Sequence, residues 1–167
     1  MTGIHRTLAA ALALASFASV ALAQNPVQIA HARAGASCPG CNLFQADFSN
    51  LEVRGRNFAR ARLRQADMST AVMNHVSFAG GDLRDVNAYG AVFGGANFAG
   101  ADLTNATFVG TFLEGANFRG AHLAGANFSG AEMGRAVGLT QRQLDQACGD
   151  AATVTPRGLR LAPCTRP

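Results

Sequence analysis

The sequence predicts an all-β solenoid, a chain wound into stacked coils around one apolar axis, because apolar residues recur at every fifth position. This register runs without a gap from Cys41 to Arg135, and eighteen of its nineteen centres are large, Ala88 being the exception. The residue two positions before the centre is Ala in twelve of the nineteen repeats, so small and large inward residues alternate. The centres are Leu43, Phe48, Val53, Phe58, Leu63, Met68, Met73, Phe78, Leu83, Ala88, Phe93, Phe98, Leu103, Phe108, Leu113, Phe118, Leu123, Phe128 and Met133.

A period of five fits neither a regular helix nor a flat strand. On an α-helix five residues advance about 500°, which would spread the centres around the whole circumference. On a straight strand an odd period sends successive centres to opposite faces. A chain that turns a corner every five residues brings all centres to one axis, as in a solenoid whose units bury their apolar face only against neighbours.

The coil is predicted to have four sides, because like residues recur every twenty positions. Four pentapeptides per coil make a square prism, and nineteen pentapeptides make nearly five coils. At strand spacing such a rod is about 20–25 Å long. The two clearest ladders are Leu43, Leu63, Leu83, Leu103 and Leu123, and Phe58, Phe78, Phe98 and Phe118.

Segments of this register resemble the pentapeptide-repeat family, whose pattern is A-(D/N)-(L/F)-x-x. Residues 96–103 read Ala-Asn-Phe-Ala-Gly-Ala-Asp-Leu, and residues 116–120 read Ala-Asn-Phe-Arg-Gly. The resemblance covers 41–135 and implies a right-handed quadrilateral β-helix. Because the family is functionally diverse, it implies little about activity.

Residues 1–23 are predicted to be a secretory signal peptide. A weakly basic start precedes an apolar run rich in Ala and Leu, and Ala21-Leu22-Ala23 fits the small-x-small cleavage rule. A membrane anchor is the alternative, but the run is short for one, and no other segment is long and apolar enough to span a bilayer. We therefore expect an exported bacterial protein, periplasmic or secreted, with residues 24–40 as a lead-in and cap.

Four cysteines form two pairs, one at each end of the rod. Cys38 and Cys41 make a C-x-x-C motif, but haem attachment would need His where Asn42 stands, and a thioredoxin-type site would need a strand–helix context. A shared zinc ion would need Cys148 and Cys164, which lie beyond the other end. We expect a local disulfide or two buried thiols at Cys38 and Cys41, and a disulfide between Cys148 and Cys164.

Stacking in the twenty-residue register predicts an exposed apolar stripe. Contiguous exposed apolar patches mark partner surfaces, whereas scattered apolar surface residues, the alternative, need no explanation. Three of the stripe residues belong to one outward row and two to the adjoining face. The stripe consists of Val72, Val92, Phe112, Tyr89 and Val109.

An arginine cluster is the second candidate surface. It could bind a polyanion such as an anionic polysaccharide or lipid head groups, or form a solvated face balanced by Asp47, Glu52 and Asp67. Arg56 falls on a small inward position, so either the coil opens there or the guanidinium reaches out past Gly55. The cluster consists of Arg54, Arg56, Arg60, Arg62 and Arg64.

After Arg135 the register is predicted to stop, and residues 136–167 are predicted to form a short capping helix and a tail. Thr140 is the expected N-cap, Gln143 completes a capping box, and the helix should run to about Cys148. Covering the last coil would block end-to-end pairing of its backbone edge. The tail could return beside the helix.

No catalytic or metal site is expected, and no cofactor. No Ser-His-Asp, Cys-His or paired-carboxylate set has plausible proximity, and a prism with a filled core should offer no cleft. The repeat block is neutral, with eight Arg and eight acidic residues, so nucleic acid is not an expected partner.

Two functional classes remain. The first is a non-enzymatic structural or interaction module of the bacterial cell envelope that binds a protein or polymer through the rod faces, with a homo-oligomer as one form of such binding. The second is the family's class of DNA-mimic topoisomerase-binding proteins, which work in the cytoplasm through an acidic surface. The predicted signal peptide and the positive flanks both argue against this second class.

Overall fold

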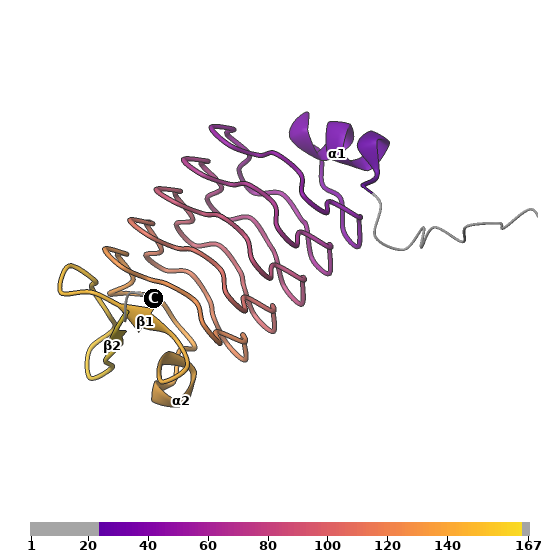
Figure 1. The fold of residues 1–167 in the computed structure, drawn as a ribbon. Coiled ribbons are helices and arrows are strands. Elements are labelled where there is room, and N and C mark those ends of the chain that lie inside the picture. Colours follow the sequence, from indigo (N-terminus) through magenta and orange to yellow (C-terminus); the bar gives the residue numbers. More distant parts are fainter. Residues whose placement is uncertain (1–23, 165–167) are drawn as a thin grey trace, which may run out of the picture.

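The computed structural model describes residues 24–164 as a rod of stacked coils, with a helix at the N-terminal end and small irregular elements at the other (Figure 1). In chain order the regular elements are α1 (Pro26–Arg33), α2 (Gln141–Leu144), β1 (Cys148–Gly149) and β2 (Ala162–Pro163). The expected signal peptide lies outside the described residues. Within 24–164, no helix has the length and apolar character needed to cross a membrane.

A parallel backbone ladder joins each coil to the next, and its rungs lie twenty residues apart. It begins where Asn42 pairs with Arg62 and keeps this spacing as far as Val137. Leu43 N donates to Arg62 O at 2.8 Å, and Arg62 N donates to Cys41 O at 2.8 Å. The predicted twenty-residue coil is therefore confirmed.

Continuous strands are scarce, although the sequence predicts an all-β chain. Each pentapeptide contributes one bridged residue and then turns. No two consecutive residues of the rod therefore form β-bridges to the neighbouring coil. Among the described residues, two-residue strands occur only as β1 and β2, which pair in parallel with Cys148 opposite Ala162. The fold is a β-helical solenoid built from isolated bridges.

The inward residues form one continuous apolar column, and all nineteen predicted centres are buried. Phenylalanine rings stack along it: the Phe98 centroid lies 5.3 Å from that of Phe78 and 5.2 Å from that of Phe118. Thr111 is the one buried polar residue in the described chain, and its hydroxyl donates to Ala88 O at 2.9 Å. That bond offsets the cost of burying a hydroxyl group.

The corners have left-handed backbone at every fifth residue from 40 to 130. Such positions favour glycine, which has no Cβ to clash with the backbone. Gly100, for example, has φ +65°. Eight corners carry other residues, among them the β-branched Thr70 at φ 56°, and these are held in place by the ladder on both sides of the turn.

The lead-in contains a helix that the sequence interpretation missed. Asn25 caps α1 by accepting a hydrogen bond from Gln28 N at 3.1 Å, and Pro26 stands in the first turn, where its missing N–H costs nothing. Ala32 is fully buried against the first coil, and Ile29 packs there partly buried. The lead-in is therefore an ordered cap.

Polar contacts complete the attachment of α1. Gln28 Oε1 accepts from Asn42 N at 2.7 Å, which satisfies a backbone donor at the edge of the first coil. Arg33 Nη1 lies 3.1 Å from Asp47 Oδ2 and also donates to Asp47 O. The helix thus replaces the neighbour that the first coil lacks.

The inter-coil ladder continues past Arg135, although the five-residue period on which the prediction relied does not. The last three bridges join Asn117 to Val137, Asn127 to Cys148 and Glu132 to Val154. Their spacings are twenty, twenty-one and twenty-two residues, so single insertions are absorbed between rungs while the ladder continues. The physical reason is that the backbone groups of the last coil still need partners.

The C-terminal helix is shorter than predicted, because α2 ends at Leu144 and not near Cys148. Its capping box is present: Gln143 N donates to Thr140 Oγ1 at 3.3 Å, and Thr140 N donates to Gln143 Oε1 at 2.9 Å. Leu144 is fully buried in the core column. Cys148 belongs to β1, where its N–H donates to Ala126 O at 2.9 Å and so continues the ladder.

Gly100→Ala should destabilise the rod through backbone strain alone. A Cβ at this corner would meet nothing within 4 Å, so the cost is that of a left-handed L-residue, about 1–2 kcal/mol. Urea unfolding followed by circular dichroism measures it. Gln65→Gly, at an equivalent corner with φ 58°, is the matched control and should unfold at the same or higher urea concentration. Wild-type stability of Gly100→Ala would contradict the corner assignment.

Asp47 should make stability depend on pH. Its pKa is lowered from 3.8 to about 2, mainly by the Ser49 hydroxyl, then by Ser49 N–H and the Arg33 guanidinium. A carboxyl with a lowered folded-state pKa stabilises the protein above its unfolded pKa and loses that contribution as pH falls. Denaturation midpoints should therefore fall between about pH 4 and pH 2. Asp47→Asn and Ser49→Ala should each flatten this slope; an unchanged slope in both would rule out this origin.

Candidate functional site

The structure places the apolar stripe on consecutive coils along one side of the rod. Val72 pairs with Val92, and Val92 pairs with Phe112, so these three residues are successive rungs of one ladder. Tyr89 and Val109, twenty residues apart, belong to the row that lies one corner earlier in the coil. Tyr89 is 57% and Phe112 36% exposed, and the three valines are partly exposed. The five side chains thus lie in two rows on consecutive coils, all partly or largely exposed.

A shallow groove of about 590 Å³ adjoins the stripe at Phe112. The expectation that a filled prism offers no cleft is therefore wrong. The groove arises where neighbouring coils differ in side-chain size at one corner, since residues 94, 95 and 115 are all glycine. It is lined by Asn74, His75, Gly94, Gly95, Phe112, Glu114, Gly115 and Arg135.

Two adjacent glycines form the floor of the groove. A Cβ added to Gly94 would lie 2.9 Å from Asn74 Oδ1 and 3.2 Å from Phe112 Cε1. A Cβ added to Gly95 would lie 2.5 Å from His75 Nδ1. The side chains of Asn74, Phe112 and His75 therefore reach over this floor only because no side chain stands on it.

The polar groups of the groove differ in how well they are satisfied. Glu114, whose side chain is 15% exposed, accepts from Arg135 Nε at 2.8 Å and from Arg135 N at 3.0 Å. Arg135 is itself 83% exposed, so this pair contributes little net stability. Asn74 Oδ1 is buried and has no hydrogen-bond partner within the described chain. An unmet buried acceptor costs about 1–3 kcal/mol.

The arginine cluster is partly neutralised. Arg54 Nε lies 2.7 Å from Glu52 Oε1, and Arg64 Nε lies 3.2 Å from Asp85 Oδ2. Arg62 stands in the ladder opposite Asp82. The pKa of Asp82 is lowered, chiefly by the hydrogen bond from Arg84. Acidic residues are therefore interleaved with the arginines, which weakens any field directed at a polyanion.

Arg56 interrupts the regular turn of its coil. It is exposed, although residues at the same position of the following coils are buried. At the next turn of the chain, Ala61 N donates to Phe58 O at 3.1 Å. Within the described chain, Arg56 N makes no equivalent bond across its own turn. Arg56 O still accepts from Ser77 N at 2.8 Å. The coil thus opens at this corner while the ladder remains intact.

Both cysteine pairs form disulfides, and none of the four cysteines is free. The Cα atoms of Cys38 and Cys41 lie 5.5 Å apart, and those of Cys148 and Cys164 lie 4.8 Å apart. This pairing within each end is the one that solenoid geometry predicts. The choice left open for Cys38 and Cys41 is resolved as a bridge. No group of three or more His, Cys, Asp or Glu side chains in 24–164 could hold a metal ion.

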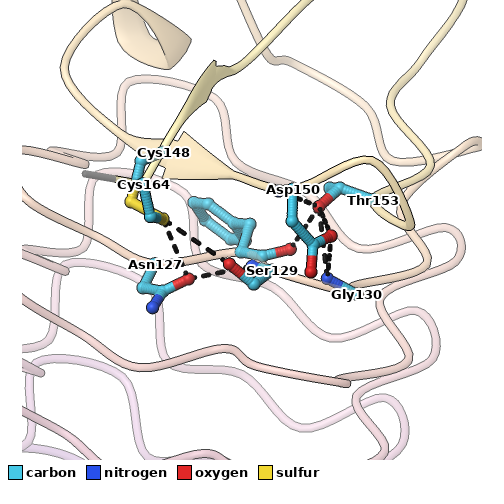
Figure 2. Close-up of a disulfide and its surroundings, with 8 residues drawn as sticks. Asn127, Ser129, Gly130, Cys148, Asp150, Thr153 and Cys164 are labelled. Atoms are coloured by element: carbon cyan, nitrogen blue, oxygen red, sulfur yellow. Dashed lines mark hydrogen bonds between the residues drawn. A yellow bond between two sulfur atoms is a disulfide. The ribbon is translucent and has the colours of Figure 1, made fainter. Parts of the chain in front are cut away.

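Figure 2 shows the bridge between Cys148 and Cys164 against the last full coil. Ser129 Oγ lies 3.5 Å from Cys164 Sγ. On the other side of the view, Asp150 accepts from Gly130 N at 2.8 Å, which is the main cause of its lowered pKa. These contacts attach the tail to the rod.

Sequence reasoning predicted the cysteine pairs but missed the groove. Asn74 and Gly94, and His75 and Gly95, lie twenty residues apart and therefore stack. A polar residue facing a glycine at the same corner of the next coil was the available signal. It was overlooked because Gly95, at a left-handed corner, has an ordinary backbone explanation.

Known proteins share this repeat architecture. The family of pentapeptide repeats matches residues 57–87, 82–120 and 96–135. Residues 57–135 of the chain are thus similar to the pentapeptide-repeat family. The solved structures of such proteins are right-handed β-helical solenoids. No curated protein sequence matches this chain at a significant level.

Two solved structures are similar in geometry. A pentapeptide-repeat protein of the Arabidopsis thaliana thylakoid lumen is 28% identical, with a TM-score of 0.60, over 65% of this chain and 79% of that one. HetL, involved in heterocyst differentiation regulation in the cyanobacterium Nostoc, is 25% identical, with a TM-score of 0.52, over 80% of this chain and 57% of that one. The fluoroquinolone resistance protein QnrB1 also matches, but at a TM-score of 0.29 it does not bear on function.

Removing the C-terminal disulfide should loosen the end of the rod. The bridge spans sixteen positions, and the chain-entropy relation for such a loop gives about 3 kcal/mol. Cys148→Ser/Cys164→Ser should therefore unfold at lower urea concentration than wild type. The disulfide between Cys38 and Cys41 closes a shorter loop. The double variant Cys38→Ser/Cys41→Ser should therefore lose less folding stability, about 2 kcal/mol. Non-reducing peptide mapping checks the pairing, and any peptide joining the two ends would contradict the rod.

Proposed function

We propose that this protein is an exported bacterial pentapeptide-repeat protein that acts as a non-enzymatic interaction module of the cell envelope. The observation that supports the proposal is the exposure of the apolar stripe, with Tyr89 57% and Phe112 36% exposed. A large exposed apolar patch costs solubility unless a partner covers it. Pentapeptide-repeat proteins are in general structural or interaction modules, which agrees with this role.

A protein partner fits the surface better than an anionic polymer. The stripe offers valine and aromatic side chains, the kind of surface that forms the core of a protein interface. The arginine cluster, the alternative surface, is interleaved with Glu52, Asp82 and Asp85. A DNA-mimic role lacks support, since the repeat block carries as many Arg as acidic residues.

The cross-section of the rod and its C-terminal cap both determine how the stripe is exposed. Four bridge positions per twenty residues support a four-sided cross-section, which would keep the stripe rows on adjoining faces. We infer that α2 and the tail serve as the cap of the last coil, because Gln143 Nε2 donates to Phe118 O and Ala121 O at 2.9 Å each. Occupying these carbonyls prevents end-to-end association, so that binding occurs through the sides.

Site-specific photocrosslinking in living bacteria tests the function. The full chain is produced with a photoreactive phenylalanine at position 89, or at exposed His122 on another face as the matched control. We expect a discrete adduct from position 89 in the periplasmic fraction, on a chain that begins at Gln24. Tyr89→Arg/Val92→Arg, probed from position 109, should abolish the adduct because two charges would enter an apolar interface.

Two results would contradict the proposal, and a third would identify the partner. Retention of the uncleaved chain in the cytoplasm would refute export. Equal adducts from positions 89 and 122 would mean that the stripe is ordinary surface. An adduct with a second copy of the chain would support docking through the stripe and identify the partner as a homo-oligomer.

A further inference from the structure

The groove beside Phe112 combines two unfavourable features in one place. Asn74 Oδ1 is a buried acceptor without a partner in the described chain. The ring of Phe112, 36% exposed, lies next to it, since both atoms approach the same point above Gly94, at 2.9 and 3.2 Å. Most buried polar atoms in proteins are hydrogen-bonded, so an orphan next to an exposed aromatic ring calls for an explanation.

One kind of ligand would remove both costs. A planar apolar group can cover the exposed Phe112 ring, and an N–H on that group can donate to Asn74 Oδ1 once the ring has turned aside. Because the ring of Phe112 is exposed, it can rotate on a fast timescale and admit the donor. Among apolar protein side chains, the tryptophan indole offers a large flat surface together with an N–H donor and no acceptor.

We propose that the groove is an anchoring pocket for a tryptophan side chain of the protein partner. This inference rests on the proposed docking function, because Phe112 belongs both to the stripe and to the groove. Its volume of about 590 Å³ is within the ~300–1,000 Å³ of ordinary ligand sites. Aromatic anchors in pockets at the centre of an apolar surface supply most of the binding energy in protein interfaces.

The other groups of the groove suit the same ligand. His75 reaches over Gly95 and offers a second flat ring at the other side of the floor. Glu114 is already engaged by Arg135, so it leaves no unpaired charge beneath an apolar ring. The exposed Arg135 guanidinium can lie over the indole face, where a cation is attracted to the ring.

The pocket can be tested with small probes and the intact purified protein. Amide resonances of Gly94, Gly95 and Gly115 are followed by NMR during titration with N-acetyl-tryptophanamide. We expect these three resonances to shift in a saturable manner. The same compound methylated on the indole nitrogen keeps the shape and loses the donor, and it should bind roughly 2- to 12-fold more weakly, as expected for one hydrogen bond.

Two variants separate binding from folding. Gly94→Ala places a methyl group on the floor without backbone strain, since its φ is not in the left-handed region, and it should abolish the shifts. Asn74→Leu removes the orphan acceptor, so binding should weaken as much as it does with the methylated probe, while the thermal midpoint stays or rises. Gly100→Ala, outside the groove, should bind the probe as wild type does.

The outcomes distinguish this proposal from the docking function. No shift with N-acetyl-tryptophanamide, or equal affinity of the methylated probe, would overturn the tryptophan pocket even if position 89 crosslinks a partner. Shifts of the same amides by a chitin tetrasaccharide but not by the tryptophan probe would overturn it in favour of a glycan site. Saturable tryptophan binding without any adduct from position 89 would support the pocket and refute docking through the stripe.

Discussion

The whole structure depends on the backbone ladder that joins one residue of each pentapeptide to the residue twenty positions later. Because each pentapeptide of the repeat block contributes a single rung, the rungs there stay twenty residues apart as far as Val137. That condition explains the strict spacing of the inward residues and the left-handed corners. It also explains why both ends need special structures, since a terminal coil has unpaired groups on one side. Gln28 serves the first coil, and Gln143 serves the last.

The ladder tolerates more variation than the repeat suggests. Toward the C-terminus its spacing grows from twenty to twenty-two residues, yet the rungs at Cys148 and Val154 still form. Arg56 shows a second kind of tolerance, because the turn opens there while the carbonyl keeps its bond to Ser77 N. In both cases the turns become irregular while the hydrogen bonds between coils are kept. That order matches the high cost of leaving buried backbone groups unpaired.

The sequence was informative where one residue type repeats at a fixed spacing. It was uninformative where a short element lies outside the repeat or where insertions interrupt it. The phenylalanine ladder predicted the coil, and the coil length predicted which cysteines could pair. The helix α1 was missed because Pro26–Arg33 has little amphipathic pattern, although Asn25 followed by Pro26 was a usable start signal. The continuation past Arg135 was missed because insertions break the period on which the prediction relied.

The candidate site shows the same contrast. The stripe could be proposed from the sequence because apolar side chains recur at fixed positions. The groove, in contrast, is produced by the absence of side chains at Gly94 and Gly95. Whether Asn74 Oδ1 finds a partner depends on rotamers and on the neighbouring ring, and spacing says nothing about either. Buried atoms without partners emerge only once the coils are stacked.

The stacking of the stripe has a consequence for how such a surface can evolve. Each coil contributes one side chain to a given row, and that side chain is not the one that fills the core. A substitution at Val92 therefore changes one side chain of the surface and leaves its neighbours in place. Duplication or loss of twenty residues would lengthen or shorten the surface by one coil, without changing the spacing of about 4.8 Å between coils. The side rows of the rod are thus modular, and their composition can change one coil at a time.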